Sequence, residues 1–337
     1  MRSLLLVTLI ASPAVASTPF GADDKPNSWR QITEKFRYKC PGPITGTKNK
    51  DEIKAGDLTI ERDGSRWTIK GTPKNPGGLN IGVLGAIKDA GRDTKKNMAT
   101  FANWFKQQKV DVVVANGDVA LDEFDLEEVL LELAKLKLPV VVFAGNSESR
   151  TSFNRTATDV ARKHPQIING NWVRELRWDG YSLWTLPGYH DKKFLYGRNG
   201  CLYTRKDIRS LGKAIGMNRK QVNVLLAHGP PRSAGDVGID RITDGKHVGD
   251  KWMAKLIKDY SIKFGIFGHI LEAGATLSTK MNKRVAKPGT EQKSLYLNAG
   301  SANGLPWGMN DGSSLRGMAA VMKLADGKGT VLFKLIK

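Results

Sequence analysis

The sequence predicts a two-sheet α/β fold with antiparallel closing strands, preceded by a small amino-terminal extension. From about residue 79 onward, short Val, Ile and Leu runs alternate with segments of helical spacing, which indicates buried, largely parallel strands joined by helices. Towards the carboxyl terminus, strand-like runs follow one another across short polar turns, which favours antiparallel pairing. With 337 residues, 40% of them hydrophobic, the chain is long enough to bury one large core or two modest ones.

The first 16 residues predict a secretory signal peptide. Met1 and Arg2 precede an apolar run over 4–10, and the small residues Ala14-Val15-Ala16 form a cleavage site. The alternative is a buried amino-terminal helix. The apolar run is too short to span a bilayer, and no other segment approaches 18 apolar residues, so we expect an exported protein, periplasmic or secreted, without a membrane span.

Residues 17–77 predict an extension that contains a β-hairpin. Residues 17–49 are polar with several Pro and Gly and indicate an extended arm, while 58–60 and 67–69 alternate around the turn Asp63-Gly64. A stretch rich in Pro, Gly and Lys over 71–78 marks the boundary of the main domain, 78–337.

The elements of the main domain follow from apolar runs and their period. Buried strands are expected over 79–85, 110–115, 139–144, 222–227 and 263–267, and helices over 94–109, 121–136 and 251–258. An antiparallel hairpin is expected over 172–178 and 181–186, and closing strands over 294–298, 317–324 and 330–336.

The two cysteines and the strong positive charge limit the covalent links and the kinds of ligand to expect. Cys40 and Cys201 can form one disulfide in an oxidising compartment, the alternative being two free thiols, and two isolated cysteines do not make a zinc-thiolate site. The net charge of +20 attracts anions, including nucleic acid, lipid headgroups and phosphorylated molecules. The charge is spread along the chain without a nucleic-acid-binding motif, so a solubility surface is the plainer interpretation and nucleic acid stays open.

Candidate metal ligands stand at the ends of four predicted strands: Asp118, Asn146, His228 and His269. Strand carboxyl ends converge on one crevice in open α/β folds. A carboxylate, an amide oxygen and two imidazoles suit Mn, Fe or Zn better than Ca. Each histidine alone has a second interpretation as a hydrogen-bonded core residue.

The order of these residues resembles the calcineurin-like metallophosphoesterase superfamily over about 79–337. That family reads Asp-x-His, Gly-Asp, Gly-Asn-His-Glu, a lone His and Gly-His-x-His. This chain reads, in the same order, Gly85-Ala86-Ile87-Lys88, Gly117-Asp118, Gly145-Asn146-Ser147-Glu148, His228-Gly229 and Gly268-His269-Ile270-Leu271. The resemblance implies a two-sheet αββα sandwich.

The same resemblance implies that one of two metal sites is degenerate. The second site would use Asp118, Asn146, His228 and His269, all present. The first would also need ligands at positions that hold Ala86, Lys88 and Leu271, and the family's general acid position holds Ser147. We therefore expect at most one divalent metal, Mn, Fe or Zn, and none is a further possibility.

Lys88 and His247 are the candidate catalytic residues. The Lys88 ammonium is expected at the vacated first site, within hydrogen-bonding reach of Asp118, where it holds phosphate; the alternative is that it merely pairs with Asp118. His247, in a Gly-rich loop, is expected to contact a leaving group, or else to be an ordinary loop residue.

Three functions remain open on the sequence. The first is one-metal hydrolysis of a phosphomonoester or phosphodiester. The second is a catalytically inactive binding or scaffold protein, and the third is a polyanion-binding surface protein. A phosphorylated or anionic ligand is expected in each, while its identity and the oligomeric state are not specified.

Overall fold

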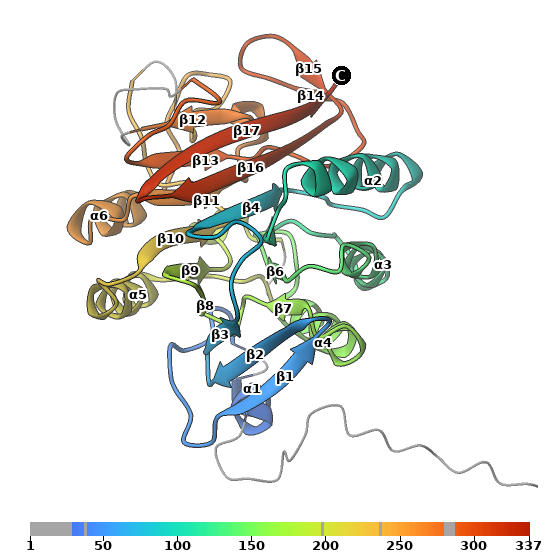
Figure 1. Cartoon of the computed structure of the whole chain (residues 1–337). Helices are drawn as coiled ribbons and strands as arrows, with labels where there is room; N and C mark the ends of the chain where they lie inside the picture. Colours follow the sequence, from blue (N-terminus) through green and yellow to red (C-terminus); the bar gives the residue numbers. More distant parts are fainter. Residues whose placement is uncertain (1–28, 37–38, 197–198, 236–237, 280–286) are drawn as a thin grey trace, which may run out of the picture.

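The structure, a computed structural model, describes residues 29–36, 39–196, 199–235, 238–279 and 287–337. Two β-sheets pack face to face and helices cover both outer faces, α2 to α4 on one side and α5 and α6 on the other (Figure 1). The predicted αββα sandwich is confirmed. The predicted signal peptide lies outside the described residues.

The first sheet has six strands in the order β17-β16-β4-β5-β6-β7. Strands β4 to β7 run parallel, and β16 pairs antiparallel with both β4 and β17. The bounds are β4 Gly78–Leu84, β5 Val112–Asn116, β6 Val140–Phe143, β7 Ile167–Asn169, β16 Gly317–Ala325 and β17 Lys328–Ile336. Every residue of β4, β5 and β6 is buried, as their continuous apolar runs predict.

The second sheet has nine strands in the order β1-β2-β3-β8-β9-β10-β11-β13-β12. Its bounds are β1 Asp51–Ala55, β2 Leu58–Asp63, β3 Arg66–Lys70, β8 Glu175–Trp178, β9 Tyr181–Leu186, β10 Val222–Ala227, β11 Phe264–Phe267, β12 Thr276–Ser278 and β13 Leu295–Asn298. Strands β9, β10, β11 and β13 are parallel neighbours. The predicted hairpins β2–β3 and β8–β9 are present.

Helices pack on the outer faces through their apolar sides. Their bounds are α2 Arg92–Gln107, α3 Glu123–Ala134, α4 Arg150–Lys163, α5 Arg205–Met217 and α6 Lys251–Asp259, with α1 Trp29–Phe36 near the amino terminus. Helices α2, α3 and α4 bury residues such as Phe101, Leu130 and Phe153 against the six-stranded sheet. None of the helices described here is long and apolar enough to cross a membrane.

The amino-terminal hairpin joins the main sheet. Strand β3 pairs in parallel with β8, with Trp67 opposite Leu176. Ile60 and Trp67 share the interior core with Leu176 and with Ile81 of β4. The predicted disulfide between Cys40 and Cys201 is confirmed and ties the segment before β1 to the loop after β9.

Candidate metal centre

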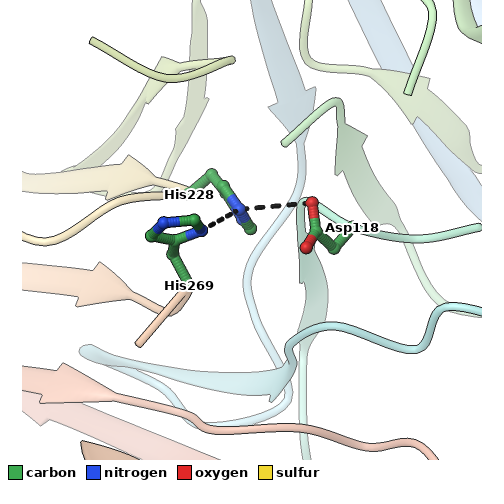
Figure 2. Close-up of side chains that lie close together, drawn as sticks. All are labelled: Asp118, His228 and His269. Carbon is green, nitrogen blue, oxygen red and sulfur yellow. Dashed lines mark hydrogen bonds and ion pairs between the residues drawn. The ribbon is translucent and has the colours of Figure 1, made fainter. Parts of the chain in front are cut away.

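The two sheets contribute different residues to one cluster at the carboxyl ends of their strands. Asp118 and Asn146 follow β5 and β6 of the six-stranded sheet, while His228 and His269 follow β10 and β11 of the nine-stranded sheet. Figure 2 shows Asp118, His228 and His269 facing one another. One potential ligand atom from each of these three lies within 4.8 Å of the others.

The distances within the cluster centre on His228. Its Nε2 lies 2.9 Å from Asn146 Oδ1, 3.1 Å from His269 Nδ1 and 3.3 Å from Asp118 Oδ1. The structure thus brings all four predicted ligands together. Two donors that each lie about 2.1 Å from one metal ion are roughly 3.0–3.4 Å apart, so these spacings suit a shared metal.

The chemistry of these atoms also fits a cation. His228 Nδ1 lies 3.0 Å from the Asn116 backbone oxygen, to which a neutral ring donates its one N–H. Its Nε2 then presents a lone pair towards a carboxylate oxygen and an amide oxygen. Lone pairs that converge in this way repel one another unless a metal ion or an added proton lies between them.

Burial and neighbouring charges set the protonation of the cluster. Burial, followed by the nearby His228, lowers the pKa of His269 to about 3, so this imidazole is neutral near pH 7. Burial alone would raise the pKa of Asp118, but His228, His269 and Lys88 bring it below its usual range. A carboxylate and neutral imidazole are the forms that bind divalent transition metals.

Glu148 holds the two ligand loops of the six-stranded sheet together. Its Oε1 accepts a hydrogen bond from the Val119 backbone N–H at 2.5 Å, and its Oε2 accepts one from the Gly145 N–H at 2.8 Å. Burial, and then the charge of Asp118, raise the pKa of Glu148 to about 8. Its two hydrogen bonds join the loop of Asp118 to that of Asn146.

Two glycines allow the loops to approach. A Cβ atom on Gly145 would lie 2.4 Å from Asp118 Oδ1, and one on Gly117 would lie 2.5 Å from His228 Nδ1. Asp118 and His269 adopt positive φ values of 49° and 67°, a conformation that non-glycine residues rarely take outside constrained sites.

Lys88 faces Asp118 but does not reach hydrogen-bonding distance. Its Nζ lies 4.0 Å from Asp118 Oδ2, which makes an ion pair, so the expected hydrogen bond is wrong. The ammonium also lies 5.4 Å from the centre of the Trp307 ring, and 28% of the side chain is exposed. Contact with the Trp307 ring and partial solvent exposure accompany this longer distance.

The other positions that the resemblance assigns to a first metal carry no ligand. Ala86 and Leu271 are buried and have no donor atom in their side chains. Ser147 directs its backbone N–H to Asp118 Oδ1 at 3.2 Å. The first half of the site is therefore degenerate, whereas the donors of the second half are assembled.

His247 is engaged by its own loop. Its Nδ1 lies 2.7 Å from Asp240 Oδ1 and its Nε2 lies 2.8 Å from the Gly235 carbonyl oxygen. The Asp240 carboxylate also accepts hydrogen bonds from the backbone N–H groups of Ser233 and Gly249. With both ring nitrogens bonded within the loop, the contact of His247 with a leaving group stays a prediction, and the geometry favours a structural role.

Sequence reasoning missed two groups that support the cluster. The ring of Tyr189, buried, lies 4.2 Å from that of His269, centre to centre. Tyr189 follows β9 by three residues, the same strand-end signal that the ligands carry. The Asn116 carbonyl, which orients His228, is a backbone group and leaves no trace in the sequence.

The fold and the cluster together place this chain in the class of metal-dependent phosphoesterases. A sequence model described as calcineurin-like phosphoesterase matches residues 87–273, more than half of the chain. The chain therefore belongs to the calcineurin-like phosphoesterase family. No curated protein matches it by sequence comparison.

One solved structure supports the fold, and two others align more weakly. TT1561 of Thermus thermophilus aligns with a TM-score of 0.52 at 13% identity, over 77% of this chain and 99% of that chain. A dimetal phosphatase from Danio rerio gives a TM-score of 0.46 at 10% identity, over 77% and 99%. The purple acid phosphatase PPD1 from yellow lupin gives 0.48 at 10% identity, over 82% and 55%.

Proposed function

We propose that this protein is a phosphoester hydrolase that works with one divalent transition metal, Mn, Fe or Zn. The observation that carries the proposal is the convergence of lone-pair atoms from Asp118, Asn146, His228 and His269 at spacings of 2.9–3.3 Å around His228 Nε2. A metal bound there would polarise a phosphoryl oxygen and lower the pKa of water.

The chain's own groups supply the rest of the site. Lys88 presents a positive charge on the Asp118 side of the cluster and is the proposed holder of a second phosphoryl oxygen. Tyr189 packs against the ring of His269. Ser147 cannot act as an imidazole acid, so the proposed reaction favours esters whose leaving group needs little protonation.

A second candidate is a binding protein that holds phosphate esters without turnover. The specific observation in its favour is the lack of donor atoms at Ala86 and Leu271, together with the Lys88 ammonium 4.0 Å from Asp118 Oδ2. Two metals normally stabilise both the attacking and the leaving oxygen, and one metal with a lysine replaces that arrangement only in part.

One experiment separates these candidates. Metal content is measured on purified protein, and Mn-loaded protein is assayed with bis(4-nitrophenyl) phosphate. We expect one metal per chain, lost in His269→Ala and kept in His164→Ala, whose histidine lies at the end of α4. Hydrolysis that depends on His269 supports the enzyme; metal binding without hydrolysis supports the binding protein. Absence of bound metal from the wild type would refute the enzyme.

We further propose that the protein is exported after removal of residues 1–16 and that 78–337 form the main domain after a 17–77 extension. The Cys40–Cys201 disulfide supports export, because structural disulfides persist in oxidising compartments. Amino-terminal sequencing of protein from culture fractions tests it, and recovery of a cytoplasmic protein that begins at Met1 would contradict it.

A further inference from the structure

Two exposed aromatic side chains stand beside the metal-capable cluster, each attached to a different part of it. Trp307 lies in β14 (Trp307–Gly308) and is 37% exposed, and Phe194 lies in the 3-10 turn η1 (Lys192–Phe194) and is 59% exposed. Large aromatic side chains contribute most when they are buried, so their exposure beside a candidate site points to a ligand.

Trp307 is held on the Asp118 side of the cluster. The Lys88 ammonium lies 5.4 Å from the ring centre and 4.0 Å from Asp118 Oδ2, which places the indole one side chain away from the carboxylate. Strand β14 pairs with β15 (Ser314–Leu315), where Leu315 is buried. In the same hairpin, the Asn310 N–H donates to the Glu272 carbonyl oxygen at 2.9 Å, in the turn that follows His269.

Phe194 is held on the Asn146 side. Its backbone oxygen accepts a hydrogen bond from Asn146 Nδ2 at 2.8 Å, and the Tyr196 N–H donates to the Asn146 backbone oxygen at 2.8 Å. The Phe194 ring meets Tyr189 edge-on at 6.2 Å, and Tyr189 in turn packs on His269 at 4.2 Å. Phe194 is thus held by direct contact with a cluster residue, and Trp307 is linked to the cluster through Lys88, which pairs with Asp118.

We propose that Trp307 and Phe194 determine specificity by stacking on planar rings of the substrate, which is a phosphodiester with a ring-bearing group on each ester oxygen. This inference rests on the proposed function, because the cluster must hold the phosphate. One aromatic side chain lies on the Asp118 side of the cluster and the other on the Asn146 side. This arrangement suits a diester, which has two substituents. A diester also carries a single negative charge, which demands less of one metal and one lysine than the dianion of a monoester.

The test compares two ligands of equal charge. Binding of diphenyl phosphate and dimethyl phosphate to the Mn-loaded full chain is measured by calorimetry. Stacking of a ring on an aromatic side chain is expected to give the wild type at least about a tenfold preference for diphenyl phosphate. Trp307→Ala and Phe194→Ala should each reduce that preference, taken as the ratio of the two affinities, several-fold, and Trp307→Phe should retain most of it.

Trp252→Ala is the matched control. Trp252, 41% exposed on α6, makes the same kind of cation–π contact at 4.1 Å, but its partner is Arg205, whereas the partner of Trp307 is Lys88, which pairs with Asp118. Its loss should leave the preference intact. A wild type that binds both diesters equally, or a preference that survives in either Trp307→Ala or Phe194→Ala, overturns the two-sided arrangement alone. If the Mn-loaded protein binds neither of the two diesters nor inorganic phosphate, the proposed function is overturned as well.

Discussion

Removal of the disulfide should cost a large part of the stability of this fold. Cys40 and Cys201 are separated by 161 residues, and in the chain-entropy model a bridge across such a loop destabilises the unfolded state by about 5 kcal/mol. Single domains are stable by only about 5–15 kcal/mol. Cys40→Ala/Cys201→Ala should therefore lower the free energy of unfolding by up to that amount, and alanine introduces no polar group at these buried positions.

Urea denaturation followed by tryptophan fluorescence measures this difference. The oxidised wild type, the reduced wild type and the double variant are compared at one pH, and the two forms without the bridge should share a lower midpoint. The reasoning would be refuted by a double variant as stable as the oxidised protein. A double variant much less stable than the reduced wild type would instead assign the effect to lost packing of the sulfur atoms.

Two further predictions concern the metal centre. Gly145→Ala should weaken Mn binding by about 10–100-fold, because the added Cβ would lie 2.4 Å from Asp118 Oδ1 and 2.6 Å from the Asp118 backbone nitrogen. Calorimetry measures this affinity, and an unchanged value would show that the two loops can move apart freely. Ala86→Asp/Lys88→His/Leu271→His should raise the metal content from one to two per chain by elemental analysis, since it restores the first-site donors. A triple variant that folds and still holds one metal would contradict the assignment of those positions.

The central strands are predictable from the sequence because strands buried on both faces consist almost entirely of apolar residues. Strands β4, β5 and β6 are apolar on both faces, so their runs stand out without any partner. Helix α4 was not predicted because Thr, Ser and Asn interrupt its short apolar face. Helix α5 was also missed: it contains Gly212, which weakens a helix signal, and a Cβ at that position would lie 2.4 Å from the Tyr260 ring.

The cluster was predictable to the same degree as the strands that carry it. Asp118 follows the end of β5 by two residues and His228 follows β10 directly, and convergence of those ends is a property of the fold. The aromatic neighbours were not predictable. Phe194 is placed by a backbone hydrogen bond to Asn146, and Trp307 by a short hairpin far along the chain. Such placements depend on loop geometry that composition and period do not encode.

The parallel pairing of β3 with β8 has a consequence for how the chain acquires its structure. Residues 66–68 pair with 175–177, so the amino-terminal hairpin cannot join the rest of its sheet until more than half of the chain is available. Loop closure of this length is slow compared with local pairing. Deleting the hairpin would also uncover the backbone of β8 along the whole contact, leaving an open sheet edge that can recruit a second chain. The amino-terminal hairpin therefore covers a sheet edge, and truncated forms that begin near residue 78 should associate.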